Sequence, residues 1–269
     1  METIFSKSNA NVKFVRGLNE KKFRLKNKAF YLEGIKVVNE VLDKEKAIDI
    51  MFIAYSKSIL VNANGGKELI EKIETLKNIK VLEFEEGIFK YVTDTVTPQG
   101  VLIVLKIPEY NLEQEISNST KSIIVLDKVQ DQGNLGTIIR SCNAFDTDII
   151  ICTQGTADIY SPKTLRSTMG GILNTKIIYI DSTQKLNILK KYGYKLVTTS
   201  LNTDTFIEDI DVSEKCAFVM GNEANGVSKE IMEMSDVLVK IPMTDKIESL
   251  NVGVATSIIL YEKYKKTSR

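Results

Sequence analysis

Histidine is absent from this 269-residue sequence, which removes the commonest general base and the commonest metal ligand. The three cysteines, Cys142, Cys152 and Cys216, are widely spaced, odd in number and show no metal-ligand spacing. We therefore expect them to be small core residues and expect no metal site. Any chemistry must rely on carboxylates, lysines, arginines, amides, hydroxyls or a bound cofactor.

Long apolar runs are also absent. No run approaches the roughly 20 residues of a membrane span, and residues 1–10 lack the apolar core of a signal peptide. We therefore expect a cytoplasmic protein without membrane association. The length suits one large domain or, preferably, two.

Negative charge is scarce at the start of the chain, although the whole chain has a net charge of only +1. In residues 1–30 only Glu2 and Glu20 oppose eight basic residues, so this segment carries a charge of +6. The basic residues are Lys7, Lys13, Arg16, Lys21, Lys22, Arg24, Lys26 and Lys28. Such a segment can neutralise nucleic-acid phosphates, and a solvated helix face is the alternative.

The pattern divides the chain into an α/β domain at 1–107, a polar linker at 108–120 and a second domain at 121–269. In the second domain, apolar runs alternate with helical patterns. We expect strands at 123–126, 149–152, 177–180, 196–198, 217–220 and 237–241. We expect helices at 134–145, 162–169, 183–192, 228–234 and 250–265. This alternation predicts a mostly parallel sheet covered on both faces, with ligands bound at the carboxyl ends of the strands.

The first loop at such an end contains Asn134 between Gly133 and Gly136, at a strand-to-helix turn that brings backbone amides close to an anion. Arg140 follows six residues later, and we expect it on a similar side of the helix. An amide and a guanidinium at one site suit a phosphate or a ribose. Taken alone, the loop also fits a nucleotide-binding glycine turn or an ordinary helix start.

The second loop, residues 220–226, reads Met-Gly-Asn-Glu-Ala-Asn-Gly after an apolar strand. A glycine-rich turn explains Gly221, Asn225 and Gly226, since Gly and Asn tolerate positive φ. It does not explain Glu223, which is therefore a candidate functional residue.

The third loop runs from the strand at 237–241 through Pro242 and Met243 to Ser249, Leu250 and Asn251. We expect Ser249 to cap the last helix. Asn251 then falls inside the first turn, where Asn is a poor helix former. A polar residue that costs helix stability indicates a functional task.

In order and spacing, the three loops resemble the motifs of the SpoU/TrmH branch of the SPOUT superfamily, the RNA 2′-O-ribose methyltransferases. The matching residues are Asn134, Gly136 and Arg140; Gly221, Glu223 and Gly226; and Ile241, Pro242, Met243, Ser249, Leu250, Asn251 and Val252. The first domain is similar to the L30e-like substrate-binding domain often fused to these enzymes, through residues 30–34 and 97–101.

The resemblance implies a deep trefoil knot in the second domain, S-adenosylmethionine as cofactor, and methyl transfer to a ribose 2′-hydroxyl. It implies catalytic roles for Asn134, Arg140, Glu223, Ser249 and Asn251 and cofactor contacts from Thr199, Gly221, Ile241, Met243 and Leu250. Arginine stays protonated in proteins, so we expect Arg140 to hold a phosphate and stabilise the developing alkoxide. Asn134 would orient the ribose or Arg140.

The resemblance further implies a homodimer through the second domain, in which Ile258, Ile259 and Leu260 form either the interface or plain core. RNA would be held by the basic start of the chain, including Lys21, Lys22 and Arg24. Asp146 and Gly253 depart from the family pattern, which more often has Gly and Ser there, as do Asp245 and Lys246 in a loop where Gly is usual.

Ribosomal RNA is the expected substrate, because the fused first domain favours it over tRNA, which is the alternative. A non-catalytic RNA-binding or ribosome-binding protein of this fold is less consistent with five intact catalytic positions. A nicotinamide-dependent enzyme is disfavoured, because no G-x-G-x-x-G turn follows a strand.

Overall fold

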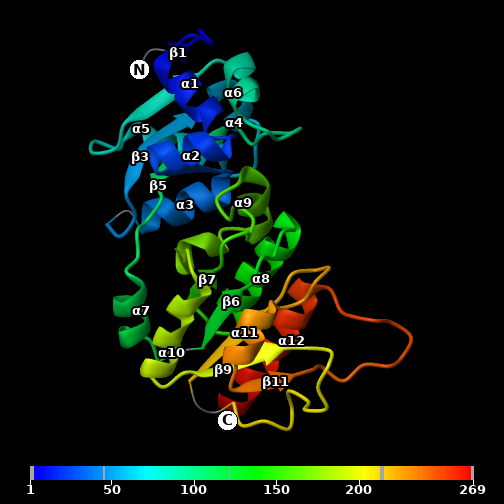
Figure 1. Cartoon of the computed structure of the whole chain (residues 1–269). Coiled ribbons are helices and arrows are strands. Elements are labelled where there is room, and N and C mark those ends of the chain that lie inside the picture. The colour runs from blue at the N-terminus through cyan, green and yellow to red at the C-terminus, as the bar shows by residue number, and fades with distance from the viewer. Residues whose placement is uncertain (1–2, 45, 121, 213–214, 268–269) are drawn as a thin grey trace. The chain divides into compact units, whose positions relative to one another are not determined.

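The computed structural model describes residues 3–44, 46–120, 122–212 and 215–267, and the chain divides into two compact units. Met1–Pro108 and Tyr160–Arg166 make up the first unit, and Glu109–Ile159 and Ser167–Arg269 make up the second. Figure 1 shows the course of the chain through both. Residues 160–166, which the sequence pattern groups with the second domain, pack in the first unit, where the rings of Tyr160 and Phe30 lie 4.9 Å apart.

The first unit is built around a mixed sheet whose described strands have the order β1-β4-β3-β5-β2. The strands are β1 (Thr3–Ile4), β2 (Ala29–Glu33), β3 (Ile50–Tyr55), β4 (Val81–Phe84) and β5 (Val101–Lys106). The helices are α1 (Ala10–Gly17), α2 (Lys21–Asn27), α3 (Ile35–Asp43), α4 (Lys57–Leu60), α5 (Gly66–Glu74) and α6 (Glu86–Val92). Its core joins α1 and α6 to the sheet through buried residues such as Val12, Val15, Phe89 and Val104.

The second unit contains a sheet whose described strands are all parallel, in the order β11-β9-β10-β6-β7-β8. The strands are β6 (Ile123–Leu126), β7 (Ile149–Cys152), β8 (Lys176–Tyr179), β9 (Lys195–Thr199), β10 (Cys216–Met220) and β11 (Val237–Val239). The helices are α7 (Leu112–Asn118), α8 (Gln132–Ala144), η1 (Gly171–Asn174), η2 (Thr183–Leu186), α10 (Asn187–Lys191), α11 (Lys229–Met234) and α12 (Val252–Thr267). Most of helix α9 (Pro162–Thr168) belongs to the first unit, and only its last two residues belong to the second.

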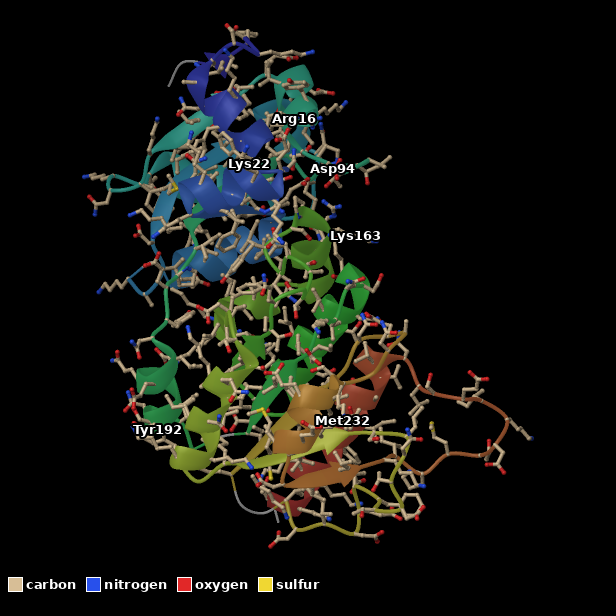
Figure 2. All side chains as sticks on the ribbon, in the orientation of Figure 1. Arg16, Lys22, Asp94, Lys163, Tyr192 and Met232 are labelled. Atoms are coloured by element: carbon tan, nitrogen blue, oxygen red, sulfur yellow. The ribbon has the colours of Figure 1, made fainter. Side chains whose placement is uncertain are left out.

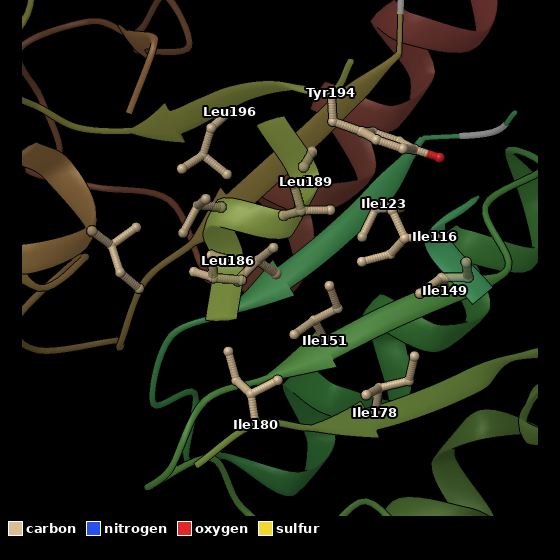
Figure 3. Close-up of a cluster of buried hydrophobic side chains, with 14 of the residues drawn as sticks. Ile116, Ile123, Ile149, Ile151, Ile178, Ile180, Leu186, Leu189, Tyr194 and Leu196 are labelled. Atoms are coloured by element: carbon tan, nitrogen blue, oxygen red, sulfur yellow. The ribbon is translucent and has the colours of Figure 1, made fainter. Parts of the chain in front are cut away.

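Both faces of this sheet are covered, as the continuous apolar strands predict. Ile123, Ile149 and Ile151 pack on one face against side chains of α7, α10 and α11 (Figure 3). Successive residues of a strand point to opposite faces. Ile124 and Ile150 are also fully buried but lie outside this cluster, so the other face is covered as well.

The segment expected to be a linker, 108–120, is largely helical. Helix α7 begins because the Asn111 side chain caps it, accepting a hydrogen bond from the Gln114 amide at 3.0 Å. Ile116 on this helix is fully buried in the core of the second unit. One buried residue in a polar stretch is too weak a periodic signal to predict such a helix.

Asp146, where the family more often has Gly, has a φ of 54° at the turn after α8. This left-handed conformation explains why Gly is common there, and Asp is one of the residues that tolerate it. In the described part of the chain, no helix is long and apolar enough to cross a membrane. The trefoil knot stays a prediction.

Candidate active site at the carboxyl edge of the parallel sheet

The second unit brings the three sequence-predicted loops to one edge of its sheet. Strands β9, β10 and β6 are neighbours, with Val219 paired to Thr198 and Met220 paired to Leu126. Because parallel strands end at the same edge, the loops that follow Thr199, Met220 and Leu126 lie side by side. The loop from β11 to α12 starts at this edge too, since Val239 pairs with Thr199.

Asn134 is fixed by the start of α8. The Asp131 side chain caps this helix and accepts a hydrogen bond from the Asn134 amide at 2.8 Å. Gly136 is required by a close approach, because a Cβ there would lie 2.0 Å from Ser167 Oγ. The Asn-x-Gly pattern therefore combines a side chain that faces the site with a position that has no room for one.

Asn134 links the other two loops. Its Nδ2 donates to Glu223 Oε1 at 2.9 Å, and its Oδ1 accepts from Asn251 Nδ2 at 2.8 Å. The Glu223 carboxylate also accepts from the backbone amides of Gln130 at 3.2 Å and Asp131 at 3.0 Å. Asn134, Glu223 and Asn251 thus form one connected group, which we call the amide–carboxylate network.

Glu223 is ionised in this network at neutral pH. Partial burial alone would raise the pKa of its carboxyl, but hydrogen bonds from Asn134 and from the backbone amides of Asp131, Glu223 and Gln130 outweigh burial. The pKa is therefore below its ordinary value. A carboxylate stabilised in this way is a poor proton acceptor and a strong anchor for the donors around it.

Asn251 has a different local role from the one predicted. Helix α12 begins at Val252, and Asn251 Oδ1 accepts from the backbone amides of Gly253 at 3.0 Å and Val254 at 3.2 Å. Asn251 is therefore the cap, and the prediction that Ser249 caps a helix starting at Leu250 was wrong. Asn is among the best capping residues, so its position stabilises the helix while Nδ2 reaches Asn134. Ser249 is exposed, in the loop that extends away from the sheet (Figure 1).

Arg140 lies apart from this network. It is exposed on α8 and makes no hydrogen bond or ion pair with the other described residues. Six residues advance a helix by one and two-thirds turns, so Arg140 projects about 120° away from Asn134. The expectation of a similar side was wrong for this reason. The guanidinium remains free to bind an anion from solution.

Three positioning residues were missed by sequence reasoning. Asp131 caps α8, which an acidic residue three places before Asn134 could have indicated. Asn222 Oδ1 accepts from the amides of Ala224 and Asn225, and its Nδ2 donates to the Lys128 carbonyl at 2.9 Å. Asp127 is buried and accepts from Thr153 Oγ1 at 3.0 Å and from the Ser228 amide at 2.7 Å. The contacts of Asn222 with Lys128 and of Asp127 with Thr153 and Ser228 join distant segments, so no local sequence pattern predicts them.

Three of the residues expected to bind a cofactor, Thr199, Gly221 and Ile241, lie at this edge. Thr199 ends β9, and Ile241 follows the paired segment in which the Ile207 amide donates to the Lys240 carbonyl at 3.0 Å. Gly221 allows a tight turn, because a Cβ there would lie 2.2 Å from the carbonyl carbon of Gly226. Ile241, Met243 and Leu250 are half-buried.

Of the three residues expected to hold RNA, Lys21 and Lys22 are exposed on α2 of the first unit, where Figure 2 labels Lys22. Arg24 is only 3% exposed, and its Nη1 donates to the Leu18 carbonyl at 2.6 Å. The prediction that Arg24 belongs to an RNA-binding surface was therefore wrong, because its guanidinium donates to a backbone carbonyl inside the first unit. Periodicity alone could not separate it from its exposed neighbours.

The fold and the loops define an α/β protein with a parallel-sheet unit of the SPOUT type, and the chain belongs to the SpoU rRNA Methylase family, whose model matches residues 121–261. A second model, the MRM3-like substrate binding domain, matches residues 9–103.

A particular relative is the 23S rRNA (guanosine(2553)-2'-O)-methyltransferase RlmP of Bacillus subtilis, which is 33% identical over 261 residues, 97% of this chain and 98% of the relative. An AdoMet-bound rRNA methyltransferase from Sinorhizobium meliloti has a TM-score of 0.87 at 28% identity, over 98% of each chain. The SpoU methyltransferase AviRb from Streptomyces viridochromogenes shares the fold, with a TM-score of 0.83 at 22% identity over 97% of this chain and 98% of that one.

Proposed function

We propose that this protein is an enzyme that transfers a methyl group from S-adenosylmethionine to a ribose 2′-hydroxyl of ribosomal RNA. The single observation that carries the proposal is the amide–carboxylate network of Asn134, Glu223 and Asn251, which joins the three family loops at one sheet edge. Family membership and the relatives named above support the same reaction and the same class of RNA.

The cofactor fits the residues present. Thr199 ends β9, and Gly221 and Ile241 follow its neighbours β10 and β11. Half-buried Ile241, Met243 and Leu250 supply apolar surface of the kind that an adenosyl group requires. When bound, S-adenosylmethionine supplies a methyl group on a sulfonium. The chain's part is to hold the loops in place, and Gly221 allows the second loop to turn tightly against Gly226.

The network residues act as positioning residues in this proposal. Each loop is held by a hydrogen bond from another loop, so the ribose hydroxyl meets a site that is already ordered. Arg140 is the catalytic residue, because its exposed guanidinium is available to hold the target phosphate and stabilise negative charge on the 2′-oxygen. We also propose a catalytic role for Ser249, which lies exposed two residues before Asn251.

We also propose that the protein is a homodimer through the second unit. Ile259 and Leu260 of α12 are buried in the unit itself, so they are core residues. Other apolar residues of α12 and its surroundings remain open, with Val254 45%, Tyr261 50% and Tyr264 42% exposed. Light scattering coupled to size exclusion tests this, and a mass of a single chain at micromolar concentration rejects it.

The experiment for the proposed function is a map of 2′-O-methylated nucleotides in rRNA and tRNA, made with and without the purified protein and S-adenosylmethionine. We expect one new site in rRNA and none in tRNA; a tRNA site alone would favour the alternative substrate.

Asn134→Ala and Glu223→Gln should each slow turnover. The double variant should be little slower than the slower single variant, because both substitutions break the same network. No S-adenosylmethionine binding and no new site, with rRNA present, would leave a non-catalytic RNA-binding protein. A cytoplasmic location accords with a ribosomal substrate.

A further inference from the structure

A pocket of about 280 Å³ lies in the second unit at the carboxyl ends of β6, β7 and β8. Its lining includes Lys128, Thr153, Gln154, Asp181, Thr183 and Glu230. None of these residues belongs to the amide–carboxylate network. The volume is just below roughly 300–1,000 Å³, the usual range for small-ligand sites, and suits a group the size of a nucleobase.

The pocket and the network share one loop, residues 127–131. The Lys128 carbonyl accepts the 2.9 Å hydrogen bond from Asn222, the residue before Glu223. Two residues further on, the Gln130 amide donates to Glu223 itself at 3.2 Å. A group bound in the pocket would therefore lie beside the nucleotide held at the network.

Buried and partly buried hydrogen bonds fix the walls of the pocket. Thr153 Oγ1 accepts from the Lys128 amide at 3.2 Å and donates to Asp127 Oδ1 at 3.0 Å. The other oxygen of Asp127 accepts from the Ser228 amide at 2.7 Å, which holds the start of α11 and hence Glu230. Such a preformed wall favours specific binding, because little ordering remains for the ligand to impose.

Lys128 is held in an unfavourable conformation that directs its side chain. Its φ is 59°, in the left-handed region that a residue with a Cβ adopts only at a cost. Its side chain crosses Gly155, where an added Cβ would lie 3.1 Å from Lys128 Cγ. Its ammonium makes no hydrogen bond or ion pair with the rest of the described chain. A strained lysine at the edge of a pocket with an available ammonium indicates a binding role.

The charges in the pocket select against a phosphate. Asp181 and Glu230 outnumber Lys128, although Asp181 is also paired with Lys185 at 2.8 Å. Glu230 Oε1 accepts from Thr183 Oγ1 and from Gln184 Nε2, which holds the carboxylate in place. A fixed carboxylate prefers two adjacent N–H donors, and an ammonium prefers carbonyl or ring-nitrogen acceptors. Guanine offers both, because N1–H and N2–H₂ lie on one edge and O6 and N7 follow it.

We propose that this pocket binds a guanine base of the substrate RNA beside the nucleotide that is methylated, with Glu230 accepting from N1–H and N2–H₂ and Lys128 donating to O6 or N7. The proposal rests on the proposed function for its RNA, and it adds a sequence preference that the network, built around a ribose, cannot supply.

The experiment is a cycle between protein and RNA variants. Short transcripts spanning the mapped methylation site carry inosine, which lacks the N2 amino group, in place of single guanosines. At one flanking position, replacement of guanosine by inosine should lower the kcat/KM of the wild-type protein about 10-fold, the usual effect of losing one hydrogen bond to a charged group. With the guanosine transcript, the kcat/KM of Glu230→Gln should be about 10-fold below that of the wild type. With the inosine transcript, the kcat/KM of Glu230→Gln should fall no further. Glu233→Gln, exposed on the same helix and paired with Lys229 at 3.5 Å, is the matched control and should behave as wild type.

The proposal would be overturned if the losses of kcat/KM caused by Glu230→Gln and by inosine multiplied when the two changes were combined. Equal kcat/KM values for Glu230→Gln and the Glu233→Gln control would also overturn it. A second measurement does not depend on turnover: GMP and AMP are titrated into the full chain, followed by the amide NMR signals of Lys128 and Gln154. GMP should shift these signals more than AMP, and Glu230→Gln should reduce the difference, because Glu230 reads the N–H groups that adenine lacks. Equal shifts would reject a guanine site. Failure of the proposed function is separate, because it would show as absence of methylation by the wild-type protein.

Discussion

Three polar side chains from separate loops of the second unit bond to one another, whereas two arginines at the start of the first unit bond to the backbone. Asn134, Glu223 and Asn251 are joined through two side-chain hydrogen bonds across three loops. Arg24 and Arg16 instead donate to the carbonyls of Leu18 and Tyr91.

The two regions should therefore respond differently to substitution. A connected network fails as a unit when one member is lost. A basic surface acts through the sum of separate charges, each of which contributes little and is screened by salt.

The largest effect is expected at Arg140, which stands outside both patterns. Arg140→Ala should reduce turnover by about 10³-fold, because it removes a charge that stabilises the transition state. Thermal stability and S-adenosylmethionine affinity should stay unchanged, since Arg140 has no partner among the described residues. Arg140→Lys should retain only a small part of the wild-type turnover, because a lysine lacks the two-pronged guanidinium group. Near-normal turnover in either variant, in single-turnover assays, would contradict a catalytic role.

In the first unit the largest effect is expected at Arg24. Arg24→Ala should lower the free energy of unfolding by about 2–3 kcal/mol, because it leaves the buried Leu18 carbonyl without its charged donor. Urea unfolding measures this, with Lys22→Ala on the same helix as the exposed control. If Arg24→Ala unfolds like wild type but loses RNA affinity, Arg24 is part of the RNA surface after all.

The Glu223 carboxyl should give the network a pH signature. Its pKa is lowered in the folded protein, so it stabilises the fold above its ordinary pKa of 4.5, and this contribution is lost as the pH falls through the folded pKa. We expect wild type to be more stable than Glu223→Gln, with a constant difference from pH 8 to about pH 5.5 that shrinks in more acid solution. Chemical denaturation across this range measures it. A difference that grows on acidification would show that the pKa is raised instead.

The smallest effects are expected at Lys21 and Lys22. Each change to Ala should weaken RNA binding by about 3-fold at low salt and reduce the slope of affinity against salt by about one unit. Stability should be unaffected, because both side chains are exposed. Filter binding at several salt concentrations distinguishes these outcomes, and an unchanged affinity in the double variant would place the RNA elsewhere.

Much of the second unit could be predicted from its sequence, because continuous apolar strands and amphipathic helices are local patterns. The strands expected at 123–126 and 149–152 match β6 and β7 at both ends. The start of α12 could not be predicted in the same way, since Ser249 and Asn251 are both good caps and only the contact of Asn251 with Asn134 decides between them. The packing of residues 160–166 in the first unit also depends on contacts with residues far away in the sequence, such as that of Tyr160 with Phe30.

The fold class, the family and the meeting of Asn134, Glu223 and Asn251 at one sheet edge could be predicted from local patterns, because loop motifs at strand ends must meet once the strands are parallel. Contacts between distant residues set the roles of individual side chains. Asn251 caps α12 and also donates to Asn134, and the Glu223 carboxylate accepts from Asn134. Hydrogen bonds between residues about a hundred positions apart depend on the register of strands and helices, which no local pattern specifies.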